Sequence, residues 1–169
     1  IYVAPHFQLK LYEEIENAGK EFGLKPFGGR ALMSMRLEKN WGAWALDFRP
    51  DFTAKESGLD VFIDWKKDFI GKKNAEKDNS NLKLTTMIVE TSDIDVTNNE
   101  AVMKDGKSIG YITSGGFAHY VKKSVAYSYL DKKILKTNEK LKVEINGDFY
   151  DCSIIKEPLY DPHGNKMRS

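Results

Sequence analysis

The sequence predicts an α+β chain in which helices come first and a small antiparallel β-structure follows. Two patterns predict this order: apolar residues recur at helical spacing over residues 5–22, and apolar and polar residues alternate in several segments of residues 82–154. Between them, residues 77–81 are polar and have no apolar anchor. We therefore expect a domain boundary there, which gives one domain over residues 1–80 and a second over residues 81–169.

The front part is expected to hold two helices with a loop between them. A short strand is predicted over residues 1–4, followed by a helix over residues 5–22 that starts with a proline and ends at Gly19 or Gly23. Glycine and proline are frequent in residues 23–29, which predicts a loop. The apolar residues that define the first helix by their spacing are Phe7, Leu11, Ile15 and Ala18.

The structure of residues 30–77, up to the expected domain boundary, is predicted from composition. Strong helix formers favour a helix over residues 30–39, although alternating apolar residues are also present there. Residues 44–56 are polar and rich in aromatic side chains, which is typical of a loop. We then expect a short apolar strand over residues 59–64 and a helix over residues 71–77.

The back part is expected to contain five or six short antiparallel strands. Asp105-Gly106 lies between two apolar segments and is a hairpin signal of type I′. The clearest alternation is Leu141–Ile145, which Asn146-Gly147 joins to a second alternating segment over residues 150–154. Short strands with tight turns of this kind form a small barrel or a sandwich.

Composition and charge exclude several classes of protein. The chain has 26 basic and 25 acidic residues, mostly interspersed, which argues against a nucleic-acid partner. No apolar stretch approaches the ~18 residues of a membrane span, so no membrane association is expected. A lone Cys152 excludes an internal disulfide and fits a reducing compartment, so we expect a soluble cytoplasmic protein.

No self-contained active site is visible in the sequence. His6, His119 and His163 are scattered without the spacing of zinc ligands, so no metal site is expected. The Gly-Gly pairs at residues 28–29 and 115–116 belong to no phosphate-binding loop, and Ser114 lacks the G-x-S-x-G context of a nucleophile. We therefore predict no catalytic residue within this chain.

Arg36 and two tryptophans form the one candidate binding motif. Arg36, Trp41 and Trp44 lie within nine residues of one another and combine a fork-shaped cation with aromatic surfaces. Such a set suits a ligand that has flat rings and a carboxylate tail. The alternative is that Arg36 pairs with a nearby acid while the tryptophan side chains fill a core.

Two segments carry a resemblance to a known family. Residues 28–39 followed by Trp41-Gly-Ala-Trp44, together with residues 110–116, resemble the second half of the folate-dependent aminomethyltransferase module, the T-protein of the glycine cleavage system. The chain is more similar still to the C-terminal module of dimethylglycine and sarcosine dehydrogenases. Further segments match the family's motifs in order: Glu56–Leu59, Lys67–Gly71, Tyr160–Pro162 and Met167–Arg168. Asn40 and Ala45 depart from the pattern, because each stands where the family has glycine.

The resemblance implies a fold, a cofactor and an activity. The fold is the C-terminal part of a folate-binding domain followed by a small antiparallel β-barrel, with Arg36 and Trp44 in a tetrahydrofolate site. The activity is capture of a one-carbon unit from a methylated amine as 5,10-methylenetetrahydrofolate. The family's assisting carboxylate and its G-Y-x-G-E-x-G-type motif belong to an N-terminal half that this sequence lacks. FAD belongs only to a region further upstream, in the dehydrogenase branch.

Several expectations follow from a partial module. We expect the isolated chain to be inactive and to self-associate, with the N-terminal half of the module as its missing partner. Two alternatives remain: a non-catalytic binding or scaffold module of folate fold, and part of another folate-dependent demethylase.

Other conspicuous residues are expected to have structural roles. Gly110, Gly115 and Gly116 are predicted to be turn or bulge positions that need a positive φ or a close backbone approach. His119 is predicted to lie in a surface loop. Glu38 is expected to support Arg36 or another basic residue rather than to act as an acid or base.

Overall fold

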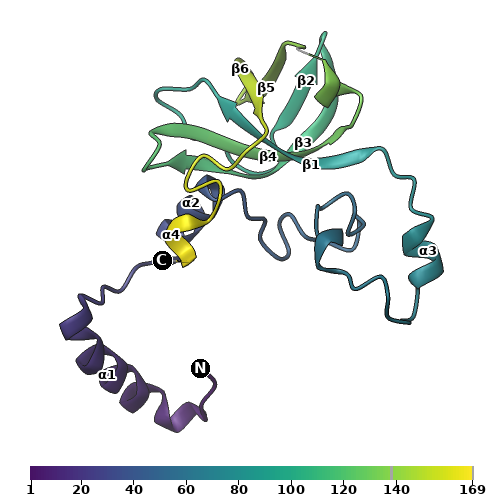
Figure 1. Cartoon of the computed structure of the whole chain (residues 1–169). Helices are drawn as coiled ribbons and strands as arrows, with labels where there is room; N and C mark the ends of the chain where they lie inside the picture. The colour runs from purple at the N-terminus through teal and green to yellow at the C-terminus, as the bar shows by residue number, and fades with distance from the viewer. Residues whose placement is uncertain (138, 169) are drawn as a thin grey trace. The chain divides into compact units, whose positions relative to one another are not determined.

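The computed structural model describes residues 1–137 and 139–168 of the chain (Figure 1). The chain divides into two compact units, residues 1–32 and residues 33–169, each of which is described by itself. This division does not coincide with the domain boundary near residue 80, which stays a prediction.

The first unit is helical. A 3₁₀ turn η1 (Pro5–Phe7) leads into α1 (Gln8–Gly19) and a second turn η2 (Lys20–Phe22), which confirms the helix expected over residues 5–22. Gly23, with a φ of 68°, ends it in the left-handed conformation that glycine adopts at little cost. The strand expected over residues 1–4 is wrong: these residues are irregular, and no described strand pairs with them.

The second helix, α2 (Gly29–Glu38), also confirms its prediction. Its helix formers therefore outweigh the alternating pattern of the same residues. Near its end, Leu37 is only 2% exposed and packs with Ala118, Val125 and Tyr127 of the β-structure.

The chain between α2 and the β-structure is mostly irregular. The strand expected around Leu59–Asp64 is wrong, because residues 60–62 form a 3₁₀ turn, η3 (Asp60–Phe62). The backbone N–H groups of Phe62 and Ile63 bond to carbonyls three residues earlier, so these groups are not available to a sheet. The helix predicted next is confirmed as α3 (Lys72–Glu76), with Gly71 before it.

The β-structure is a closed antiparallel barrel of six strands, so the barrel alternative is confirmed and the sandwich is not (Figure 1). The order around the barrel is β1-β4-β3-β2-β5-β6, and β6 pairs with β1 to close it. The strands are β1 (Leu82–Val89), β2 (Ala101–Lys104), β3 (Lys107–Ala118), β4 (Lys123–Asp131), β5 (Leu141–Ile145) and β6 (Asp148–Ile155).

Both predicted hairpin turns are present. Asp105 and Gly106, with φ values of 48° and 75°, join β2 to β3; Asn146 and Gly147, with φ values of 53° and 92°, join β5 to β6. Positive φ at both central residues is the requirement of a type I′ turn, and Asn, Asp and Gly tolerate it best. These dipeptides therefore fix the register of their hairpins.

Gly110, Gly115 and Gly116 lie inside the long strand β3, so the turn part of their prediction is wrong. The pairing of β2 with β3 shifts register beside Gly110, as at a β-bulge, and Gly116 has a positive φ of 159°, both as predicted. The expected close approach does occur at Gly115. A Cβ atom there would lie 2.7 Å from the carbonyl oxygen of Val96, which leaves room only for hydrogen.

The core of the barrel is apolar and contains the single cysteine. Met87, Val102, Ile112 and Leu130 are fully buried in it, and Cys152 is 8% exposed. Burial raises the pKa of the Cys152 thiol to about 12, so the thiol is protonated and unreactive at neutral pH. None of the described helices is long and apolar enough to cross a membrane. The cellular compartment stays a prediction.

Candidate functional site

A fully buried carboxylate lies between the loop after α2 and the barrel. The side chain of Asp47 has an exposure of 0% and accepts four hydrogen bonds. Its Oδ2 atom accepts from Arg36 Nη1 at 2.9 Å, from Ser114 Oγ at 2.8 Å and from the backbone N–H of Ala43 at 2.8 Å. Its Oδ1 atom accepts from the Thr113 hydroxyl. A buried charge is tolerated only when it is paired and hydrogen-bonded, and Asp47 meets both conditions.

An irregularity in β3 brings the two hydroxyls to the same carboxylate. Neighbouring side chains of a regular strand point to opposite faces. The pairing of β3 with β4 shifts register between Ile112 and Ser114, as at a β-bulge. Thr113 and Ser114 can therefore both reach Asp47, although they are adjacent in sequence.

Arg36 is held by internal acceptors. Its side chain is 10% exposed and pairs with Asp47, and its Nη2 atom donates to Ser114 Oγ at 2.8 Å. It also donates to the carbonyl of Trp41 at 3.2 Å and to the sulfur of Met33 at 3.2 Å. Four of its five N–H groups thus have acceptors among the described residues. The pairing of Arg36 with a nearby acid is therefore correct, and that acid is Asp47.

The barrel also fixes the end of α2. The hydroxyl of Tyr127, from β4, donates to the carbonyls of Arg36 and Leu37 at 3.1 Å and 3.0 Å. Burial raises the pKa of Tyr127, so its hydroxyl keeps the proton that these bonds need. The same two carbonyls also accept the backbone N–H groups of Trp41 and Asn40, at 3.0 Å and 3.2 Å, so the end of the helix has its acceptors paired from two directions.

The tryptophans of the loop do not fill a core, which corrects that part of the alternative. Trp41 is 51% exposed and Trp44 is 80% exposed. Trp41 packs edge-on against Phe48 and Phe62, with ring centroids 6.1 Å apart in each case, and Trp44 packs against Phe48 at 5.8 Å. We call Trp41, Trp44, Phe48 and Phe62 the aromatic patch. Phe48 is its buried member, at 8% exposure, and the other three side chains are exposed. A cluster of exposed large aromatic side chains is typical of a surface that receives a ligand or a partner.

The two residues that replace glycine both adopt the conformation that favours glycine. Asn40 has a φ of 58° and Ala45 has a φ of 66°. Asparagine tolerates this region, whereas alanine is strained in it by roughly 1 kcal/mol. The side chain of Asn40 is also hydrogen-bonded by the Thr86 hydroxyl of β1. The loop that carries the tryptophans therefore begins and ends with a left-handed turn.

Glu38 has a different role from the one expected. Its side chain is buried and accepts the backbone N–H groups of Tyr120 and Val121, at 2.6 Å and 3.4 Å. It thus fixes the turn between β3 and β4 rather than supporting Arg36. His119, in the same turn, is exposed, as predicted for a surface loop.

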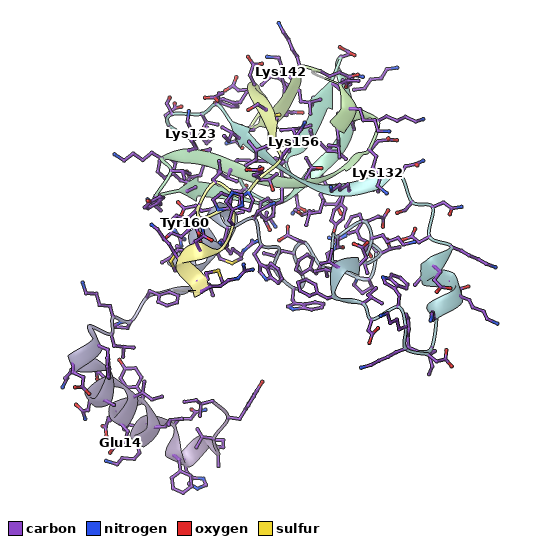
Figure 2. The ribbon with its side chains drawn as sticks, viewed as in Figure 1. Glu14, Lys123, Lys132, Lys142, Lys156 and Tyr160 are labelled. Carbon is purple, nitrogen blue, oxygen red and sulfur yellow. The ribbon has the colours of Figure 1, made fainter. Side chains whose placement is uncertain are left out.

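The C-terminal segment is attached to the end of α2. The backbone N–H of Tyr160, which Figure 2 labels, donates to the carbonyl of Glu38 at 3.0 Å. Lys39 Nζ lies 3.0 Å from the carboxylate of Asp161. Burial raises the pKa of Asp161, but hydrogen bonds from Lys39 and from the backbone N–H of Lys166 outweigh it and hold this pKa below its usual value. Asp161 is therefore ionised at neutral pH and holds Lys39 in place.

A cleft of about 590 Å³ lies between Trp41 and this segment. Besides Trp41, its lining includes Lys39, His163, Met167 and Arg168. No three His, Cys, Asp or Glu side chains gather as metal ligands within residues 1–137 and 139–168.

Sequence reasoning missed Asp47, the two hydroxyls that contact it, and Phe62. One signal for Asp47 is present: it is the single acid in an otherwise apolar stretch, Trp44-Ala-Leu-Asp-Phe48. Nothing local identifies its partners, since Thr113 lies 66 residues further along the chain.

Asp47→Asn should destabilise the protein by about 3–5 kcal/mol, because it leaves the Arg36 charge buried without a counter-charge. Equilibrium unfolding in urea, followed by circular dichroism, measures the effect. The double variant R36M/D47N should lose less stability than the sum of the losses in the two single variants, because the two side chains interact directly. The exposed Asp68→Asn serves as the control and should change stability by less than about 0.5 kcal/mol. Equal stability of D47N and D68N would contradict this account of the pair.

Comparison with known proteins agrees with this architecture. Residues 1–67 match the family model described as the GCVT N-terminal domain, and residues 83–161 match the glycine cleavage T-protein C-terminal barrel domain. The solved structure of glycine cleavage system aminomethyltransferase T from Bartonella henselae is similar with a TM-score of 0.71 at 21% identity, over 78% of this chain and 38% of that one. At that identity the likeness shows the fold alone.

Curated relatives match nearly the whole chain. Mitochondrial dimethylglycine dehydrogenase from Rattus norvegicus is 38% identical over 154 residues, which are 88% of this chain and 18% of that protein. An aminomethyltransferase from Desulfitobacterium hafniense is 30% identical over 168 residues, 97% of this chain and 46% of that protein. The chain thus spans less than half the length of these relatives. With both domain models matched in order, it belongs to the glycine cleavage T-protein family.

Proposed function

We propose that this chain contributes the aromatic wall of a tetrahydrofolate site, in a module that takes a one-carbon unit from a methylated amine of the dimethylglycine or sarcosine type. The observation that carries the proposal is the aromatic patch, which is exposed and yet anchored to the buried pair of Arg36 and Asp47. The names of the relatives, aminomethyltransferase and dimethylglycine dehydrogenase, support the class of reaction. We propose tetrahydrofolate because the family uses it.

The residues present fit such a ligand. Flat pterin and benzoyl rings need apolar surfaces to stack on, and Trp41, Trp44 and Phe62 are each more than half exposed in one cluster. Trp44 has the largest free ring surface of the patch. We therefore propose Trp44 as a stacking residue, in keeping with its position in the family motif.

Arg36 belongs to the proposed site mainly as a positioning residue. Its guanidinium donates to the carbonyl of Trp41, and Asp47 in turn accepts the N–H of Ala43, so the pair fixes the backbone on both sides of Gly42. Four of the five N–H groups of Arg36 have acceptors among residues 1–137 and 139–168, and we propose that the fifth contacts the ligand. The arginine then orients the aromatic patch and adds a single charged contact at its base.

Bound tetrahydrofolate supplies the nitrogen that receives the one-carbon unit. The side chains of this chain bind and orient its rings and exclude water from one face. Asp47 does not serve as the general base, because it is fully buried and accepts four hydrogen bonds from the protein itself. We propose that the acid–base carboxylate comes from another part of a longer module.

The proposal is tested by titrating the full chain with tetrahydrofolate under reducing, anaerobic conditions and measuring the affinity by calorimetry. Trp44→Ala should weaken binding by roughly 1–3 kcal/mol, the usual value of one ring stacked on an aromatic side chain. Phe149→Ala is the matched control, since Phe149 is 54% exposed on β6, outside the patch.

Equal affinities of the two variants would exclude a stacking role for Trp44. A folded chain that binds no tetrahydrofolate would overturn the proposal and favour a non-catalytic scaffold module instead. If this chain binds tetrahydrofolate but a longer protein that contains it is inactive on dimethylglycine and sarcosine, the chain would instead be part of another folate-dependent demethylase.

The chain alone should not form methylenetetrahydrofolate, because positioning and charge stabilisation need the complete set of catalytic groups. A coupled assay with dimethylglycine, tetrahydrofolate and an electron acceptor would measure this, with a full-length dimethylglycine dehydrogenase as the positive control. Product formation above the protein-free background would overturn the expectation.

We also propose that the chain self-associates through the apolar face of α1. Leu11, Tyr12 and Ile15 lie on one side of this helix, beside a groove of about 570 Å³, and Tyr12 and Ile15 are 54% and 40% exposed. Sedimentation velocity over a concentration series should show a mass that rises with concentration. Ile15→Glu should shift the chain to monomer, whereas Asn17→Glu, on the polar side, should not. A monomer at all concentrations would contradict the proposal.

A further inference from the structure

We propose that Tyr129 is a positioning residue for the tetrahydrofolate site, because its buried hydroxyl holds the peptide group between Asp47 and Phe48, on which the aromatic patch is built. The inference rests on the proposed function, since the patch is the surface proposed to bind the rings of tetrahydrofolate. Tyr129 lies in β4 and is only 5% exposed, so it acts on the ligand through the patch rather than by contact.

The hydroxyl of Tyr129 makes two hydrogen bonds whose direction is fixed. It lies 2.9 Å from the backbone carbonyl oxygen of Asp47 and 2.7 Å from the hydroxyl oxygen of Ser57. A carbonyl oxygen can only accept, and a phenol has a single hydrogen. Tyr129 therefore donates to Asp47, and Ser57 donates to Tyr129. Burial raises the pKa of Tyr129, so the hydrogen that it donates is present at neutral pH.

The bond to Asp47 sets the orientation of Phe48. The carbonyl of Asp47 belongs to the planar peptide group that also contains the N–H of Phe48, so a bond to that oxygen restricts rotation of the whole group. The rings of Trp41 and Trp44 both pack edge-on against the Phe48 ring, at centroid distances of 6.1 Å and 5.8 Å. Rotation of this one peptide group would consequently move the surface on which both tryptophans rest.

Close packing leaves this peptide group little other freedom. A Cβ atom at Gly42 would lie 2.6 Å from two carbons of the Phe48 ring, so the ring lies directly against the backbone there. The side chain of Asp47 bonds to Thr113 and Ser114 of β3, whereas its carbonyl bonds to β4. Asp47 is thus attached to two neighbouring strands of the barrel, once through its side chain and once through its main chain.

The segment that returns from the patch to the barrel also rests on Tyr129. The ring of Phe52 stacks on the Tyr129 ring, with centroids 3.5 Å apart and an angle of 9° between the planes. Ser57 follows Glu56, whose carbonyl accepts the backbone N–H of Leu84 in β1 at 2.8 Å. The donor to Tyr129 is therefore itself fixed to the barrel. A surface that is ordered before the ligand arrives loses less entropy on binding.

The central experiment compares Tyr129→Phe with the parent chain by calorimetric titration with tetrahydrofolate. This substitution keeps the ring on which Phe52 stacks and removes only the hydroxyl. It should weaken tetrahydrofolate binding about fivefold, the loss expected for one neutral hydrogen bond. Ser57→Ala, which leaves the bond from Tyr129 to the Asp47 carbonyl in place, should weaken binding less than Tyr129→Phe.

Ser128→Ala is the matched control. It also removes a buried hydroxyl of β4 that donates to a backbone carbonyl, in this case the carbonyl of Tyr111 in β3 at 2.8 Å. The affinity of this variant for tetrahydrofolate should stay within about twofold of that of the parent chain, because the lost bond lies within the barrel.

A spectroscopic measurement separates positioning from a general loss of stability. In a Trp65→Phe background the two remaining tryptophans are Trp41 and Trp44, so time-resolved fluorescence anisotropy reports the motion of the patch. Y129F should increase the fast depolarisation of these rings, whereas S128A should not. Both variants should lower the melting temperature, since each loses a buried hydrogen bond.

The outcomes distinguish this inference from the proposed function. If tetrahydrofolate binds and W44A weakens it, but Y129F changes neither affinity nor anisotropy, Tyr129 is not a positioning residue and the folate site stands. Weaker binding by Y129F without faster motion of the tryptophans would also overturn the inference. If the parent chain binds no tetrahydrofolate, the proposed function is wrong, while faster depolarisation in Y129F would still show that Tyr129 orders the patch.

Discussion

The buried ion pair between Arg36 and Asp47 is the interaction on which the rest of the candidate site depends. Removing two charges from water is costly, and their mutual attraction alone rarely repays it. Here Asp47 gains three further hydrogen bonds, from Thr113, Ser114 and Ala43, which complete its shell of donors. The arrangement is therefore less a source of net stability than a means of specifying one geometry.

That geometry connects parts of the chain that are distant in sequence. Arg36 lies in the last turn of α2, Asp47 lies in the loop that follows, and Thr113 lies in the middle of a barrel strand, 66 residues beyond Asp47. The irregular pairing of β3 lets adjacent side chains serve the same carboxylate. The loop with its tryptophans is consequently held against the barrel, so the aromatic patch has its shape only when the barrel is folded.

Local patterns were enough to predict the helices and hairpins but not the site. The helix over residues 5–22 and the turn at Asn146-Gly147 are encoded by neighbours in sequence, so spacing and turn chemistry identified them. The apolar segment at residues 59–64 is too short for its pattern to distinguish a strand from a turn. Local backbone hydrogen bonds stabilise a 3₁₀ turn there instead. Asp47 and Glu38 bind groups far along the chain, and only the tertiary structure reveals those partners.

Closure of the barrel has a consequence for the way this chain meets other molecules. Each of the six described strands has a neighbour on both sides, so the barrel offers no open edge to a foreign strand. Backbone-driven polymerisation of the amyloid kind is thereby blocked at the barrel while it remains folded. Contacts of the barrel with other proteins must then use side chains, whose interactions are reversible and selective.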